Sequence, residues 1–345
     1  MIEYVLRRVA WAVVQLFAAS VILFVLFYVT PGPYASVSGA YATPSHGEGR
    51  TGRFRETGSA PAEYVRFLGH VVHGEFGRSQ RTHQDVGVLI RRAWPATASV
   101  VFGGLLLWLV VSLVVGVWSA MRPRSLIDRV GNVFVLVGTA AHPLWLGLIV
   151  SYVFGYRLQW FPLVGYCDLI RPALGSECGG PVQWAYHLFL PWIVFAAAYA
   201  ALYTRMIRSS LLATMQDDFV RTARAKGLSE LKVMRRHTFR AALLPLATML
   251  TMDIGLAFGG TMFVEQAFEI PGLGHMLVQA APRRDLPVIF GIMVVVAAFV
   301  LVLNLVLDIL YGLIDPRIAV LEPRGTRRWL SVRRPPAPAP AAQPR

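Results

Sequence analysis

The chain has 345 residues, of which 55% are hydrophobic and only 15% are charged. Because soluble domains contain about a quarter charged residues, this composition indicates a membrane protein. The formal net charge of +14 would suit a nucleic-acid-binding protein, but the basic residues lie mainly in segments between apolar stretches. That distribution excludes nucleic acid as the expected partner.

Six apolar stretches have about the 20 residues that an α-helix needs to cross the hydrocarbon of a bilayer. They comprise residues 9–29, 97–120, 131–155, 186–203, 243–264 and 288–307. None contains Lys or Arg, and Asp253 is their only carboxylate. Since lipid offers no partner to a strand edge, the predicted fold is an all-α polytopic membrane protein with six transmembrane helices.

The first of these stretches resembles a secretory signal because Arg7 and Arg8 precede it. It is longer than the apolar part of a typical signal, and the following Thr-Pro-Gly-Pro is a poor cleavage site. Residues 1–30 are therefore predicted to form a retained N-terminal transmembrane helix.

The basic residues predict the orientation. With the N-terminus inside, residues 1–8, 121–130, 204–242 and 308–345 are cytoplasmic and hold 21 of the 33 Lys and Arg residues. This asymmetry follows the positive-inside rule. Both termini are therefore expected in the cytoplasm, where basic loops meet an anionic leaflet.

Residues 31–94 are expected to form a long extracytoplasmic loop. Its first half is rich in Gly, Ser, Thr and Arg and is expected to be flexible. Apolar residues recur at helical spacing over 64–72 and again over 86–90, which predicts two short amphipathic helices before Pro95 opens the second span.

Residues 95–316 are expected to form the main membrane domain, followed by a tail over 317–345. The tail ends in RRPPAPAPAAQPR, a composition typical of disordered or polyproline-like chain. It is predicted to be a disordered cytoplasmic tail.

The two cysteines, Cys167 and Cys178, both lie in a predicted outer loop. An outer compartment permits disulfides, and ten intervening residues are enough to close one. Two unpaired thiols are the alternative, because the sequence does not give the distance between the Cα atoms.

The chain contains no motif of a soluble catalytic domain. It has no phosphate-binding G-x-x-x-x-G-K-[ST], no G-x-S-x-G and no H-E-x-x-H. The only lysines are Lys226 and Lys232. If the protein does work driven by ATP, another chain must bind the nucleotide.

Residues 217–236, DDFVRTARAKGLSELKVMRR, form a basic segment between two apolar stretches. Asp217 or Asp218 can cap a helix, Gly227 can end it, and Ser229 can cap a second one. On its own, this composition favours an amphipathic helix pair lying on the membrane surface.

Asp253 lies at the centre of the fifth stretch, where a carboxylate is costly and faces the interior of the bundle. We expect it either to line a translocation path and favour a substrate's amino group, or to make a structural hydrogen bond to Ser, Thr or Asn on another helix. Asn304 and Asp308 share one helical face. Glu265, at the outer end of the fifth stretch, is expected to order the Pro271–Gly274 loop as part of an outer gate. Pro271, Gly272 and Asn304 are further candidates for the path or the gate.

The chain has eight histidines, but no recognised ligand spacing links them. Surface histidines are the favoured interpretation, with His70 and His73 on an amphipathic helix. A metal such as nickel is kept as an alternative substrate, and no bound metal is expected.

The segment from Asp218 to Pro245 resembles the cytoplasmic loop of ABC-importer permeases of the dipeptide, oligopeptide and nickel type. Further similar pieces follow in the family's order. They are residues 4–33, 64–97, 160–166 (WFPLVGY), 265–274 (EQAFEIPGLG) and 307–318 (LDILYGLIDPRI). Together they cover most of the chain apart from 36–60, parts of 167–185 and the tail.

The resemblance implies the type I importer permease fold, with residues 217–236 as the helix that couples the permease to a separate ATPase. Contacts with the ATPase are implied for Asp218, Phe219, Arg221, Ala223, Arg224, Lys226, Gly227 and Leu231. Of these, Phe219, Ala223 and Leu231 would enter a groove, and the arginines would meet its acidic rim. Relative to the general motif E-A-A-x-x-x-G, Arg221 and Thr222 replace Glu and Ala.

The resemblance also implies a multi-pass subunit of the bacterial inner membrane that forms half of a path for peptides. Its implied partners are a homologous second permease, two ABC ATPases that bind ATP and Mg, and an extracytoplasmic solute-binding protein. No catalytic residue or bound cofactor is expected in this chain. A secondary carrier, a nickel-type importer permease and a polytopic membrane enzyme are the alternatives.

Overall fold

The computed structural model describes residues 2–25, 60–122, 125–126, 129–131, 133, 138, 141–170, 178–234, 238–239 and 244–314. Its main elements are α1 (Ile2–Phe24), α3 (Ala60–Val72), α4 (Val86–Met121), α6 (Pro143–Val150), a π-helix (Ser151–Arg157), α7 (Pro181–Thr214), α8 (Asp218–Ala225), α9 (Glu230–Val233), α11 (Leu244–Ala267), α12 (Leu273–Ala280) and α13 (Leu286–Ile314). These residues contain helices and two isolated β-bridges, and no strand. The prediction of an all-helical architecture is confirmed for this part of the chain.

Four of the described helices are long and apolar enough to cross a membrane. They are Val5–Phe24, Val86–Met121, Pro181–Thr214 and Leu286–Ile309. They correspond to the first, second, fourth and sixth predicted spans. The fifth corresponds to α11, whereas the third is only partly described and ends in α6 and the π-helix. The count of six spans therefore stays a prediction.

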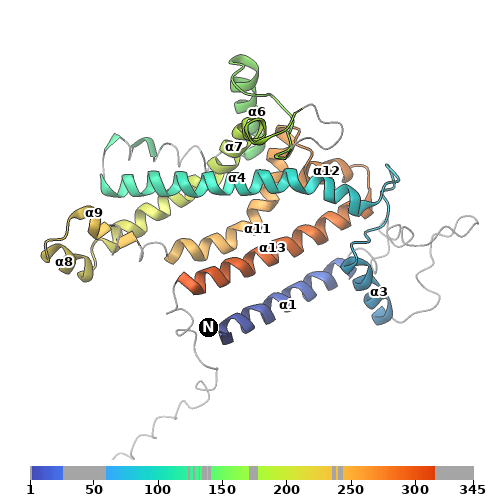
Figure 1. The fold of residues 1–345 in the computed structure, drawn as a ribbon, viewed down its shortest axis with the longest axis horizontal. Coiled ribbons are helices and arrows are strands. Elements are labelled where there is room, and N and C mark those ends of the chain that lie inside the picture. Colours follow the sequence, from blue (N-terminus) through green and yellow to red (C-terminus); the bar gives the residue numbers. More distant parts are fainter. Residues whose placement is uncertain are drawn as a thin grey trace, which may run out of the picture.

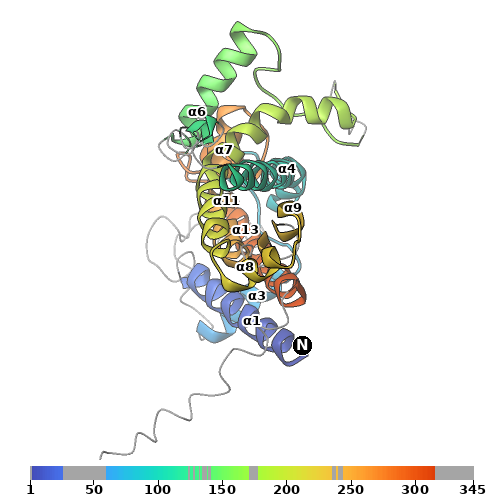
Figure 2. The same ribbon diagram turned by 90° about the vertical axis from the view of Figure 1, so that its left-hand side faces the viewer.

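The long helices run lengthwise through an elongated molecule (Figure 1). Helices α8 and α9 lie at one end of the long axis, and α3 and α12 lie toward the other. Figure 2 views the molecule from the α8–α9 end, with the N-terminus of α1 also toward the viewer. This arrangement separates an end that carries the basic segment from an end that carries the predicted outer loops.

Close packing of α4 against α7 forms the main core, which is centred on Trp108, Phe195 and Tyr203. Gly104 allows this approach because a Cβ at that position would collide with the Phe195 ring. Small residues at helix contacts let backbones approach closely in membrane proteins. The Arg208 Nε also donates to Ser119 Oγ across the two helices, over 3.0 Å.

The helix α4 begins earlier than predicted. Residues 86–90 are its first turns rather than a separate short helix, and Pro95 lies inside it. Asp85 caps its N-terminus by accepting a hydrogen bond from the Val88 N–H. Val86 and Ile90 are buried in a second core at the end of the molecule that carries α3 and α12. Tertiary packing therefore continues the helix past a residue that normally breaks one.

The helix α1 packs along α13 and is anchored near both ends. Arg8 forms an ion pair with Asp308 of α13, with 3.0 Å between nitrogen and oxygen. Farther along α1, Ser20 Oγ lies 2.6 Å from Tyr64 Oη of α3, and Phe24 packs against the Tyr64 ring. Residues 39–59 of the predicted flexible segment 39–62 lie outside the described residues, whereas its last three residues form the start of α3. The tail over 317–345 also lies outside the described residues.

Candidate functional site

Helices α8 and α9 form a small helix pair with its own apolar centre. Val220, Ala223 and Val233 are buried there, and Leu228 packs against them. Because Val220 and Ala223 are three residues apart, they lie on the same face of α8. The segment is therefore a compact unit rather than an extended loop.

Gly227 makes the turn between the two helices. Its φ of +77° lies in the left-handed region, which glycine adopts without the strain that a Cβ would bring. Its N–H donates to the Arg224 carbonyl, and the Ser229 carbonyl accepts from the Lys232 and Val233 N–H groups. The backbone thus reverses within a few residues and starts α9 directly.

The exposed surface of α8 carries one large apolar side chain and several charged ones. Phe219 is 46% exposed, and Arg221, Arg224 and Lys226 are exposed. Asp218 is also exposed and lies 3.9 Å from Arg221. Such an arrangement suits a partner groove that is apolar inside and acidic at its edge.

The structure places the remaining predicted contact residues as follows. Ala223 is only 5% exposed, so it packs inside the helix pair instead of facing outward beside Phe219. The side chain of Leu231 lies outside the described residues, as do residues 235–236. Asp217 stands at the N-cap of α8, but its side chain makes no capping hydrogen bond.

A second site surrounds Glu265 near the C-terminal end of α11. The Glu265 side chain is fully buried, and its Oε1 accepts from Thr97 Oγ1 of α4 over 2.7 Å. Its Oε2 accepts from the His275 N–H at the start of α12 over 2.9 Å. Thr97 Oγ1 in turn accepts from the Leu273 N–H. One carboxylate therefore joins α4, α11 and α12, and it lies where the dipole of α12 favours negative charge.

This network explains the glycine in the predicted gate loop. A Cβ on Gly272 would overlap the Glu265 carboxylate, so only glycine lets the loop approach so closely. Pro271 is exposed beside it. The structure therefore brings Glu265 and Gly272 into contact.

A third site surrounds Asp253 in the middle of α11. The Tyr203 hydroxyl of α7 donates to Asp253 Oδ2 over 2.8 Å. Trp108 of α4 packs on Tyr203 with ring centroids 4.6 Å apart. Asn304 of α13 is half-buried, and its Oδ1 has no hydrogen-bond partner among the described residues.

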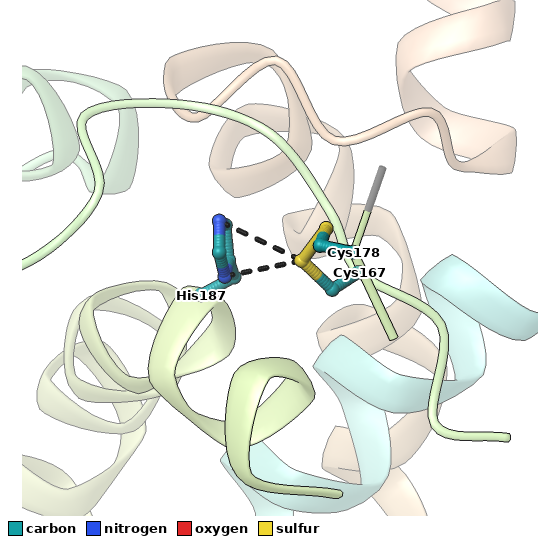
Figure 3. A group of neighbouring side chains, drawn as sticks. All are labelled: Cys167, Cys178 and His187. Carbon is teal, nitrogen blue, oxygen red and sulfur yellow. Dashed lines mark hydrogen bonds between the residues drawn. A yellow bond between two sulfur atoms is a disulfide. The ribbon is translucent and has the colours of Figure 1, made fainter. Parts of the chain in front are cut away.

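Cys167 and Cys178 form a disulfide with their Cα atoms 5.3 Å apart. Cys167 Sγ lies 3.3 Å from Nδ1 of His187 on α7 (Figure 3). The three side chains have the proximity of metal ligands. While the disulfide holds, however, neither sulfur is a thiolate, the form that binds a metal.

Sequence reasoning missed Thr97, Tyr203 and His187. Each contacts a predicted residue from a distant helix, for example Thr97, 168 positions before Glu265. For Thr97 and Tyr203, the one available signal was the type of residue, since hydroxyl groups in apolar helices commonly form hydrogen bonds to neighbouring helices.

Comparisons with known proteins identify the family of this chain. Residues 112–320 match the family described as binding-protein-dependent transport system inner membrane component. The chain therefore belongs to this family, the membrane permeases of ABC importers.

Among its relatives is a peptide permease protein of Brucella suis biovar 1, which is 36% identical over 93% of this chain and 100% of that protein. Another is the oligopeptide transport system permease protein AppB of Bacillus subtilis, which is 35% identical over 92% of this chain and 99% of AppB.

Proposed function

We propose that this chain is a permease subunit of an ATP-driven importer of peptides and forms half of the translocation path. The names of the relatives from Brucella suis and Bacillus subtilis support peptides as the substrate class. The matches extend over nearly the full length of both proteins, so they include the outer segments as well as the family region.

The α8–α9 pair is the proposed contact with a separate ATPase. The observation that carries this assignment is that Phe219, Arg221, Arg224 and Lys226 are all exposed on a self-packed helix pair. A compact unit with its own buried centre transmits displacement of a partner better than a flexible loop does. Nucleotide and Mg would bind to two such ATPases and not to this chain.

The proposed assembly contains a homologous second permease, the two ATPases and an extracytoplasmic solute-binding protein. Closure of the ATPases on ATP would draw the two α8–α9 pairs together and rock the permeases toward the outward-facing state. The proposed location is the bacterial inner membrane, with both termini and the α8–α9 end in the cytoplasm. The positive-inside distribution supports this orientation.

The Glu265 network is the proposed outer gate. It joins α11 to α4 and to the loop that contains Pro271 and Gly272. Because the carboxylate is buried and hydrogen-bonded on both oxygens, these elements are expected to move together when the gate opens.

The coupling assignment is tested with Phe219→Ala and a matched control, Phe102→Ala. Phe102 lies on α4 and is 48% exposed, close to the 46% of Phe219. Removal of a central aromatic anchor costs about 2 kcal/mol or more, roughly a thirtyfold loss of affinity. We therefore expect Phe219→Ala to lose the co-purifying ATPase and ATP-dependent peptide uptake.

Phe102→Ala should retain both properties. Equal retention of the ATPase by the two variants would refute the contact at Phe219. Uptake of peptide by the purified chain without any ATPase would instead favour a secondary carrier.

A further inference from the structure

We propose that Asp253, together with Tyr203 and Tyr199 of α7, forms a site for the ammonium group of a peptide on its way through the permease. This inference rests on the proposed function of peptide import. It adds the chemical group recognised and the residues that recognise it.

The Asp253 carboxylate lies deep in the membrane without a charge partner. It is the tenth residue of α11, so it lies about 14 Å from the start of that helix, near the centre of a 30 Å hydrocarbon layer. Among the residues that the structure describes, no Lys, Arg or His pairs with it. An intramembrane carboxylate normally pairs or faces a hydrated path, because its charge is otherwise costly.

Asp253 is nevertheless held in a defined position. Tyr203 is only 1% exposed and donates its hydroxyl proton to Oδ2. Trp108 packs edge-on against Tyr203 and stacks on Tyr199, with centroid distances of 4.6 and 4.7 Å. The described residues provide no hydrogen bond to Oδ1, so this oxygen remains free to accept one from a ligand.

The carboxylate borders an exposed face of α11. Its neighbour Met252 is 72% exposed, and Leu256, one turn further on, is 68% exposed. Asp253 itself is half-buried. A charge at the border of a lipid-covered face would be costly, so we expect this face to line the path shared with the second permease.

Other polar atoms gather around the same depth. Trp108 Nε1 and Thr204 Oγ1 are buried without hydrogen-bond partners among the described residues, as is Asn304 Oδ1. Phe258 of α11 packs against Phe299 of α13, and the two helices run in opposite directions along the molecule (Figure 1). This register places Asn304 level with Asp253. Unpaired polar atoms at one depth are typical of a region that receives polar ligands.

These groups match an ammonium ion. An ammonium has three donors and a positive charge, whereas the site offers the free carboxylate oxygen of Asp253 and the hydroxyl oxygen of Tyr203. The Tyr199 hydroxyl lies farther along α11, beside Gly260. Tyr199 is partly exposed and can also present its ring, which attracts a cation. A peptide always carries such a group at its free N-terminus, and some peptides carry another on a lysine. The carboxylate would repel an anionic group.

The experiment uses the complete permease–ATPase assembly in proteoliposomes, with the binding protein of the same transport system. Uptake of a defined tripeptide mixture is measured by mass spectrometry for wild type, Asp253→Asn and Asp253→Glu. Glu75→Gln, at an exposed position of an outer segment that the proposed sites do not use, is the control for removing one negative charge. ATP hydrolysis stimulated by the loaded binding protein is measured in parallel.

We expect Asp253→Asn to slow uptake about tenfold or more, the loss that corresponds to one charge-assisted hydrogen bond. Lysine-containing tripeptides should be slowed most. Asp253→Glu should restore most of the uptake, and stimulated ATP hydrolysis should persist in both variants. Glu75→Gln should behave as wild type.

Wild-type uptake by Asp253→Asn would overturn the ammonium site. A parallel loss of uptake and of stimulated ATP hydrolysis would also overturn it, because that pattern indicates a structural role. If Asp253→Asn does not assemble, Tyr203→Phe removes the hydroxyl that contacts Asp253 without changing the charge, and unchanged uptake would then refute the site. A wild-type assembly that imports no peptide would refute peptide import itself, so the two failures are distinguishable.

Discussion

Thr97 of α4 donates its hydroxyl proton to Glu265 of α11 over 2.7 Å, and both side chains are buried. The same Thr97 oxygen accepts from the Leu273 N–H at the start of α12 over 2.7 Å. One hydroxyl group of α4 therefore donates to α11 and accepts from the start of α12, where these helices meet.

Thr97→Val should destabilise the protein, because valine has the shape of threonine but neither donates nor accepts. Glu265 Oε1 and the Leu273 N–H would then each lose a partner in a buried site. We expect the free energy of unfolding to fall by about 1–3 kcal/mol, measured by thermal unfolding in detergent. Thr82→Val, at an exposed position, is the control, and an equal fall in both variants would contradict the role of the network.

Gly227→Val should weaken the α8–α9 pair through backbone strain alone. An added Cβ would meet nothing within 4 Å, but the φ of +77° costs an ordinary residue about 1–2 kcal/mol. We expect faster amide hydrogen exchange over residues 217–234 and less co-purifying ATPase. Gly227→Asn should lose less, because asparagine tolerates this conformation better. Wild-type exchange in Gly227→Val would contradict the prediction.

Removal of the disulfide by Cys167→Ala with Cys178→Ala should lower the free energy of unfolding by about 2–4 kcal/mol. A reducing agent should lower the unfolding temperature of wild type in the same way. The same reagent should leave the double variant unchanged, because the chain has only two cysteines. Insensitivity of the wild type to reduction would show that the bond does not contribute to stability.

Exchange of the charges in the Arg8–Asp308 pair should reveal how much this ion pair contributes to the stability of the protein. Arg8→Glu or Asp308→Arg alone places like charges together, and the double variant restores an attraction. Since the side chains are 34% and 22% exposed, water screens the pair and we expect a coupling energy of about 0.5–1 kcal/mol. A double-mutant cycle on thermal unfolding measures it, and additive effects of the two changes would exclude direct coupling.

The sequence predicted the long helices well because the length and polarity of a lipid-crossing helix are set by the bilayer. It placed the start of the second span at Pro95, whereas α4 begins at Val86. A proline inside an apolar pattern is typical of a boundary, and the packing of Val86 and Ile90 against outer segments is not visible in local periodicity.

The candidate sites were predicted less completely. Periodicity grouped Ala223 with Phe219, yet the return of the chain through Gly227 brings Val233 over Ala223 and buries it. The position of α9 depends on the turn rather than on the helical pattern of α8. Similarly, Asp253 was identified because a charged carboxylate is energetically costly within an apolar span. That Tyr203 is its hydrogen-bond partner could not be predicted, because this contact depends on how α7 packs against α11.

The two contacts that anchor α1 fix the number of residues between them. Arg8, which pairs with Asp308, and Ser20, which meets Tyr64, are separated by a stretch of helix about 18 Å long. Insertion of one residue between them would rotate one anchor by about 100° relative to the other, so both could not be satisfied at once. The number of residues between the anchors is therefore constrained more tightly than their identities, many of which can exchange among apolar types.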